Sequence, residues 1–494
     1  MAAETLPAAR RGPRDLTSGP IAPALVAFAL PTLGSNILQS MNASINTIWI
    51  GRFLGHGALA ATANANLVLF IAFAVVFGFG LAATILIGQA VGARDLDRAR
   101  RVLGTAIGGF AVASVAVSAA GWFASDAILR GLATPGDAMP LAHAYLRVIF
   151  LSLPASFLVL VLAMALRGAG DAVTPFAMMI VTVVLDAGLN PVLILGLGPA
   201  PRLGIAGSAL ATVVASYATL IGFVAIVYGR RLPIRLIGTE LRYLVPDPAI
   251  LRVVMAKGLP MGAQMFVVTA SALALTGIVN RAGVDHAAAF GVAQQLWSYV
   301  QMPALAVGAA VSAMAAQNIG AGRWERVGAI TRSGIVVNVA MTSVLIVALT
   351  AADRPALSLF LPGGGAATAI AAHANWIVGW SFVPFGVTMV LFATVRANGA
   401  VTAPLVILAI ALIPVRLGVA FAGAPRFGID AVWWALPIGS IVSVAMAAAY
   451  YRFGGWRRQR MMPPPAPAEL AGEAVAAAPP TTRRPPVEPA SVEG

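Results

Sequence analysis

The sequence predicts an all-α integral membrane protein with twelve transmembrane helices, arranged in two pseudo-symmetric six-helix lobes around a central cavity. Hydrophobic residues make up 59% of the 494 residues and charged residues only 10%, whereas a soluble domain carries about 25% charged residues. The mean hydropathy is +0.88. In addition, landmarks of the first half of the chain return in the second half, in the same order and about 229 residues later.

The repeat is marked by short motifs that lie far apart within each half. They are Pro31 with Pro260, Gln89-Ala-Val-Gly92 with Gln317-Asn-Ile-Gly320, and the stretch 167–175 with the stretch 396–404. A membrane protein duplicated in this way usually binds its substrate between the two halves. We therefore expect the substrate to bind between the two halves.

The first copy divides into six apolar segments at charged residues or at glycine and proline. A span needs about 20 apolar residues. We predict spans over 22–50, 58–90, 103–125, 141–166, 173–198 and 204–228. The residues that bound these spans are Gly51 and Arg52, Arg94, Arg101 and Arg130, Pro140 and Arg167, Asp171 and Pro199, and Arg230.

The second copy divides in the same way, with predicted spans over 250–279, 287–316, 328–351, 368–395, 401–424 and 428–451. Because six is an even number, both copies run in the same direction through the bilayer, as parallel repeats do. The predicted organisation is a cytoplasmic N-terminal tail (1–19), a first lobe (20–228), a cytoplasmic inter-lobe loop (229–249), a second lobe (250–452) and a disordered cytoplasmic tail (453–494).

The basic residues predict the orientation in the membrane. Of the 32 lysines and arginines, 24 lie on the side of the two termini, six lie on the other side, and Arg147 and Arg416 lie within spans. The positive-inside rule therefore places both termini in the cytoplasm of a protein of the plasma membrane, which is the inner membrane in a Gram-negative cell. The net charge of +14 is spread along the cytoplasmic face, where the basic residues would meet anionic lipid headgroups. We therefore expect the lipid bilayer, and no nucleic acid, as a partner, and we expect a monomer.

The composition also argues against an enzyme. The absence of cysteine excludes disulfides, thiol nucleophiles and cysteine metal sites. The four histidines fall in two pairs, each 230 residues apart, and so echo the repeat. A polytopic membrane enzyme needs clustered acids, histidines or serine–base pairs, and the scattered acids do not supply them. We expect no metal site and no cofactor apart from a coupling ion.

Asp186 is the one acidic residue deep within a predicted span. Asn190 follows four residues later and so lies on the same helix face. Pro191 cannot donate a hydrogen bond to the carbonyl of Ala187, which leaves a free oxygen beside the carboxylate. An ionisable group within a span is a functional candidate by default, and this group of oxygens suits a proton or a hard cation. The alternative is a neutral, hydrogen-bonded packing residue.

A polar stripe on the first span is formed by Asn36, Gln39, Asn42 and Asn46, at spacings of three or four residues. Such a stripe either lines a wet cavity or bonds to neighbouring helices, and we favour the cavity. The further candidates for its wall are Asn64, Asn66, Met178, Gln264, Gln294 and Gln295, although methionine within a span often serves only packing.

Several motifs resemble those of the multidrug and toxic compound extrusion (MATE) family. They are Asp15-Leu-Thr-Ser-Gly-Pro-Ile21, Thr47-Ile-Trp-Ile-Gly51-Arg-Phe-Leu-Gly55, the Arg167-Gly-Ala-Gly-Asp-Ala-Val-Thr-Pro175 box and Leu203-Gly-Ile-Ala-Gly207, within a match from about residue 15 to 452. The resemblance implies a secondary antiporter with two six-helix lobes around a central cavity, which exports cationic or amphipathic small organic compounds in exchange for protons or sodium.

The resemblance also implies roles for individual residues. The family usually has an aspartate in the first span, where this chain has Asn46, and an Asn-x-x-x-Asp pattern that appears here transposed, as Asp186 and Asn190. Thr212 matches a family threonine near that site. Because one carboxylate neutralises a bound cation less well than two, we favour H⁺ over Na⁺ as the coupling ion.

The nearer alternative is a flippase for lipid-linked saccharides, since a related branch of the same superfamily also has paired six-span lobes. Such a cavity would be lined by several arginines or lysines that bind pyrophosphate. The deep spans offer only Arg147 and Arg416.

Overall fold

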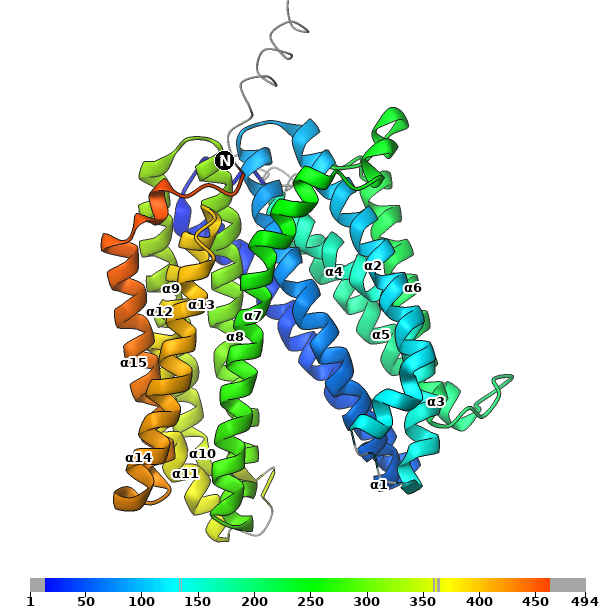
Figure 1. Cartoon of the computed structure of the whole chain (residues 1–494), viewed down its shortest axis with the longest axis vertical. Coiled ribbons are helices and arrows are strands. Elements are labelled where there is room, and N and C mark those ends of the chain that lie inside the picture. Colours follow the sequence, from blue (N-terminus) through cyan, green and yellow to red (C-terminus); the bar gives the residue numbers. More distant parts are fainter. Residues whose placement is uncertain (1–13, 133, 135, 359, 362–364, 463–494) are drawn as a thin grey trace, which may run out of the picture. The chain divides into compact units, whose positions relative to one another are not determined.

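Figure 1 shows a computed structural model of the chain, which describes residues 14–132, 134, 136–358, 360–361 and 365–462. Every regular element within these ranges is a helix. The described residues up to Met461 form one compact unit, to which all the helices described below belong.

The first lobe is built from α1 (Ile21–Gly92), α2 (Leu96–Gly131), α3 (Met139–Phe150), α4 (Leu153–Gly168), α5 (Val173–Leu195) and α6 (Ile205–Gly229), with a short 3₁₀ turn, η1 (Gly136–Ala138), before α3. α1 holds the first two predicted spans and turns at Gly55, whose φ of 80° is in the left-handed region that favours glycine. α3 and α4 meet at a 49° bend in place of the single predicted span 141–166. Pro154, in the first turn of α4, has no N–H with which to continue the helix from α3.

The second lobe is built from α7 (Pro248–Arg281), α8 (Val284–Gly320), α9 (Trp324–Ala351), α10 (Asp353–Ser358), α11 (Ala366–Val378), α12 (Phe382–Ala397), α13 (Thr402–Ile410), α14 (Arg416–Phe427) and α15 (Asp430–Phe453). A 3₁₀ turn, η3 (Gly379–Ser381), joins α11 to α12, and a π-helical turn, η4 (Ala411–Val415), joins α13 to α14. η2 (Gly238–Leu244) lies between α6 and α7 in the chain and bonds to α2 through Glu240 and Tyr243, and η5 (Gly455–Arg458) follows α15.

Among the described residues, eleven helical segments are long and apolar enough to cross a membrane, and the bent pair α3–α4 makes a twelfth. α13, η4 and α14 count as one such segment, as do α11, η3 and α12. The predicted all-α membrane fold with twelve spans is therefore confirmed.

Each lobe has its own hydrophobic core. In the first lobe the core brings α1, α2, α3, α4 and α6 together around residues such as Phe157. In the second lobe it surrounds Trp433, which is fully buried. A further core joins the lobes, since Leu25 at the start of α1 packs in the same cluster as Met314 of α8. α1 therefore contributes to both halves of the protein.

Part of each predicted tail is packed into the folded protein. Within the predicted tail 1–19, Leu16 is only 1% exposed, and its N–H donates to Oε1 of Gln317 (3.2 Å). Within the predicted tail 453–494, Trp456 is 1% exposed and its ring stacks on Tyr451 at 5.3 Å. In both cases a large apolar side chain within a polar stretch is buried, because burial removes its apolar surface from water. Residues 14–19 and 453–461 therefore belong to the folded unit, whereas residues 1–13 and 463–494 of the predicted tails lie outside the described residues.

Residues 14–19, which we call the N-terminal segment, connect the two lobes. The backbone N–H of Arg14 donates to the carbonyl of Gly170 in the first lobe (3.4 Å). In the second lobe Arg323 donates to the carbonyl of Thr17 (2.6 Å). Hydrogen bonds from Thr17 hold the pKa of the Asp15 carboxyl below its ordinary value. We call the side of the bundle on which this segment lies the terminal side.

The lobes touch at the terminal side through the ends of α1 and α8. The backbone of Gly92 lies against the carbonyl of Gln317, and the backbone of Gly320 lies against the carbonyl of Gln89, so that neither position has room for a Cβ atom. These four residues are the repeated motif seen in the sequence. Glycine at both positions lets the two helix backbones approach closely.

The two glutamines of this crossing bond across it in a symmetric way. Nε2 of Gln89 donates to the carbonyl of Ala397 at the end of α12 (2.7 Å), and Nε2 of Gln317 donates to the carbonyl of Gly168 at the end of α4 (3.0 Å). Each bond joins one lobe to the other. In the sequence these glutamines are recognisable only as part of the repeat, and no sequence signal indicates that they hold the lobes together.

Candidate ion and substrate site

The candidate site is centred on Asp186 of α5, which is 1% exposed. Its Oδ2 accepts hydrogen bonds from Nδ2 of Asn42 and from Nδ2 of Asn46, both at 2.8 Å. Its Oδ1 accepts one from the hydroxyl of Thr212 (3.1 Å) and a longer one from Nδ2 of Asn190 (3.3 Å). The structure thus brings together the four residues predicted from the sequence for coupling, and adds Asn42.

Three helices position these side chains. Asn42 and Asn46 are four residues apart on α1, so they lie on one face of that helix. Asn190 is placed in the same way relative to Asp186 on α5, and Thr212 belongs to α6. α5 continues through Pro191 without a break. Nδ2 of Asn190 bonds to the carbonyl of Asp186 (2.9 Å) and to Oδ1 of Asn46 (2.9 Å), and so links α5 to α1.

The environment of Asp186 is polar but carries no compensating charge. Every hydrogen-bond donor to its carboxylate is a neutral amide or hydroxyl, and no described lysine, arginine or histidine pairs with it. A buried carboxylate without a cationic partner is costly unless it is protonated or binds a cation. Oδ1 of Asn42 and Oδ1 of Asn190 are buried and accept no hydrogen bond within the described structure. Carboxylate, amide and hydroxyl oxygens together form a donor set that suits a proton or a hard monovalent cation.

The remaining predicted cavity residues of the first lobe are more scattered. Asn36 is half-buried, whereas Gln39 and Asn66 are exposed. Met178 is buried, and its sulfur would lie 3.0 Å from a Cβ atom added to Gly222 of α6. The side chain of Asn64 lies outside the described part of the structure.

In the second lobe, Gln264 is only 5% exposed and its Oε1 accepts a hydrogen bond from Arg396 (3.3 Å). This hydrogen bond joins α7 to α12 within the second lobe, and a place of Gln264 in the cavity wall stays a prediction. Gln294 and Gln295 are half-buried, and Gln295 donates to the hydroxyl of Tyr299 (3.3 Å). None of these three residues is joined to Asp186 by a hydrogen bond.

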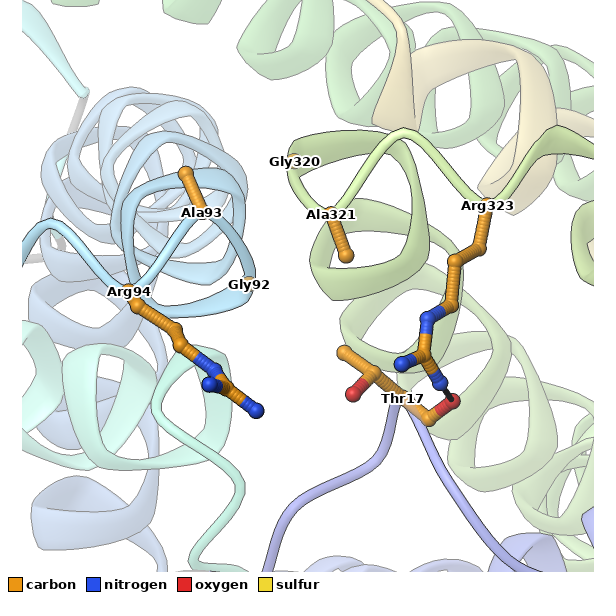
Figure 2. Close-up of a pocket in the computed structure, with 7 residues that line it drawn as sticks. All are labelled: Thr17, Gly92, Ala93, Arg94, Gly320, Ala321 and Arg323. Carbon is orange, nitrogen blue, oxygen red and sulfur yellow. Dashed lines mark hydrogen bonds between the residues drawn. The ribbon is translucent and has the colours of Figure 1, made fainter.

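A separate pocket lies at the terminal side, where α1 and α8 end. It is lined by Thr17, Gly92, Ala93, Arg94, Gly320, Ala321 and Arg323. Figure 2 shows Arg94 and Arg323 on opposite walls, one from each lobe, with Thr17 of the N-terminal segment bonded to Arg323. This pocket contains none of the residues predicted to bind substrate or coupling ion. It marks the place where the lobes and the N-terminal segment meet.

Comparison with known proteins agrees with this architecture. The sequence matches the MatE family over residues 31–192 and 260–422, one segment in each lobe. It is 36% identical over 429 residues to the "Probable multidrug resistance protein YoeA" of Bacillus subtilis, covering 86% of this chain and 92% of that protein. It is 30% identical over 445 residues to the "Probable multidrug resistance protein YpnP" of the same organism, covering 90% of this chain and 97% of that protein.

Among solved structures, a crystal structure of MATE in complex with MaL6 superposes with a TM-score of 0.83. The superposition covers 90% of this chain and 99% of the other, at 21% sequence identity, and it shows that the two chains share a fold. The paired segments matched in the two lobes, the identity to full-length relatives and the shared twelve-helix fold lead to one conclusion. The chain belongs to the MatE family of membrane transporters, the multidrug and toxic compound extrusion family, and is not an enzyme.

Proposed function

We propose that this protein exports cationic or amphipathic organic compounds across the plasma membrane in exchange for protons, by alternating access of its two lobes. The observation that carries the proposal is Asp186, a buried carboxylate within a span that is bonded only to neutral donors. The names of the relatives, which describe probable multidrug resistance proteins, support the class of cargo.

The proton is the simpler coupling ion because the site has a single carboxylate. Protonation removes the uncompensated charge of Asp186, and deprotonation restores a carboxylate held by Asn42, Asn46 and Thr212. Sodium is the second candidate, and the observation that favours it is the pair of unpartnered buried oxygens on Asn42 and Asn190. Hard cations prefer oxygen ligands of this kind.

Transport by the purified protein in liposomes tests the proposal and separates the two ions. With rhodamine 123 as a cationic cargo, we expect uphill accumulation when only a pH difference is imposed. We expect none when only a sodium gradient is imposed. Accumulation driven by sodium alone would show that sodium, and not the proton, is the coupling ion. The absence of accumulation under either gradient would contradict secondary antiport.

The orientation follows from the distribution of basic residues, which we propose places the terminal side in the cytoplasm. Because the chain has no cysteine, a single introduced thiol reports its own location. We expect Thr239→Cys, at an exposed position of η2, to resist a membrane-impermeant thiol reagent in intact cells and to react after the cells are opened. Leu203→Cys, which precedes α6, should react in intact cells. The reverse pattern would contradict the proposed orientation.

Alternating access requires the α1–α8 crossing to open during each cycle. A Cβ atom added to Gly88 would lie 3.0 Å from Cβ of Ala316 across this crossing, which is shorter than the roughly 3.5–4.5 Å between Cβ atoms in disulfides. A small separation of the two helices would therefore give a distance that a disulfide can span. The double variant Gly88→Cys/Ala316→Cys is therefore expected to lose export when oxidised and to regain it in dithiothreitol, while each single variant remains insensitive to oxidation. Full export with complete crosslinking would rule out opening at this crossing.

A further inference from the structure

Arg416 lies in the middle of a membrane-spanning segment of the second lobe. It follows the π-helical turn η4 and begins α14, within the apolar span Thr402–Phe427. The guanidinium of arginine stays charged inside proteins. An ionisable group at this depth is costly, and such groups usually serve a function.

The position of Arg416 corresponds to that of Asp186 in the first lobe. Pro175 of α5 aligns with Pro404 of α13, an offset of 229 residues (404 minus 175), so that Asp186 would align with residue 415. A π-helical turn accommodates one additional residue, and η4 lies between the aligned proline and Arg416. The two lobes therefore carry opposite charges at equivalent places in their fifth spans.

The side chain of Arg416 packs against a neighbouring span. A Cβ atom added to Gly439 of α15 would lie 3.3 Å from Cβ and 3.4 Å from Nε of Arg416. Ser271 of α7 donates to the carbonyl of Leu412 in η4 (2.9 Å), and so holds the π-helical turn against α7. Arg416 thus sits where three spans of the second lobe meet, as Asp186 does in the first lobe.

Arg416 has no partner of opposite charge in the described structure. No described residue accepts a hydrogen bond from it or forms an ion pair with it, and its Nε atom is buried without a partner. The four acidic residues between 250 and 452 all lie in the first turn of a helix, not at the depth of Arg416: Asp285, Glu325, Asp353 and Asp430. None of these residues balances the charge, and because Arg416 is only half-buried, its guanidinium is open to an anion from outside the chain.

We propose that Arg416 binds an anionic group of the transported compound, a carboxylate or a phosphate. The planar guanidinium is suited to bidentate recognition of either group. The opposite charges of the two lobes would then favour amphipathic cargo that carries both an amine and an acid. This inference rests on the proposed export function and narrows its substrate class.

Two dyes that differ only at a carboxyl group test the inference. Rhodamine 110 has a free carboxylate, and rhodamine 123 is its methyl ester. We expect Arg416→Gln to weaken equilibrium binding of rhodamine 110 to the purified protein by about 10- to 100-fold, the range for losing a charge-assisted hydrogen bond. Binding of rhodamine 123 should stay within about twofold of the wild type by the same measure. Fluorescence anisotropy reports both affinities.

Matched variants separate binding from folding. Arg147→Gln removes another arginine within a span, one that lies over the ring of Trp122 at 5.6 Å, and it should change neither affinity. Arg416→Lys keeps the positive charge without the guanidinium fork, and we expect a smaller loss that is still selective for rhodamine 110. If Arg416→Gln does not fold, the affinities of Arg416→Lys for the two dyes test the inference.

The other outcomes overturn the inference. Equal losses for both dyes, no loss for either, or no binding of rhodamine 110 to the wild type would each contradict a carboxylate contact with Arg416. If the anion is instead chloride, wild-type binding of rhodamine 123 would weaken when isethionate replaces chloride, and Arg416→Gln would remove that dependence. Accumulation of rhodamine 123 driven by a pH difference remains a separate test of export, because the ester has no carboxylate for Arg416 to bind.

Discussion

Replacing Asp186 by asparagine is expected to reduce accumulation driven by a pH difference to the level of protein-free liposomes. The amide has the size of the carboxyl group but cannot take up or release a proton in the transport cycle. The variant should still fold, because the side chains of Asn42, Asn46 and Thr212 can reorient to offer acceptors as well as donors. Transport in liposomes under an imposed pH difference, together with the amount of protein extracted from membranes, measures both expectations.

Asn46→Asp provides the complementary variant. The amide nitrogen of Asn46 lies 2.8 Å from Oδ2 of Asp186, so a second carboxylate at position 46 would face the first at close range. Two carboxylates this close favour a bound cation or a shared proton, and we expect Asn46→Asp to increase the response to a sodium gradient. Export that persists in Asp186→Asn under a pH difference alone would show that coupling occurs elsewhere.

Replacing Gly92 by valine is expected to prevent the lobes from closing at the α1–α8 crossing. The added Cβ atom would overlap the carbonyl of Gln317, which is backbone and cannot move aside without moving α8. Overpacking costs about 1–3 kcal/mol, which corresponds to a shift of about 5- to 150-fold in the balance between two states. Export should fall accordingly, and a cysteine introduced at the buried Ala316 should react faster with a thiol reagent.

Gly277→Val is the matched control for this prediction. Gly277 also lies inside a long helix, α7, but a Cβ atom added there would meet no atom of another helix within 4 Å. We expect this variant to export at the rate of the wild type and to leave the reactivity at Ala316 unchanged. If Gly92→Val behaves like Gly277→Val, close contact of the two backbones is not needed for the cycle.

The class of the protein, its spans and its repeat could be predicted from the sequence because each depends on local composition. About 20 apolar residues suffice to define a span, and motifs such as Gln89-Ala-Val-Gly92 and its second copy needed only to be aligned. Asp186 was identified because one acidic residue in a long apolar segment stands out without any knowledge of its neighbours. The helical period also placed Asn190 beside it.

The partners of these residues were decided by tertiary structure alone. A polar stripe on α1 has a defined face but no defined neighbour, so the sequence left open that Asn42 and Asn46 bond to Asp186 while Gln39 is exposed. The burial of Leu16 and Trp456 was missed because a single apolar residue in a polar stretch carries no periodic signal. The contact of the lobes through Gly92 and the missing counter-charge of Arg416 depend on helices far apart in the chain. Local sequence determines where each helix lies in the chain and which of its faces is polar, whereas packing between helices determines which groups each side chain contacts.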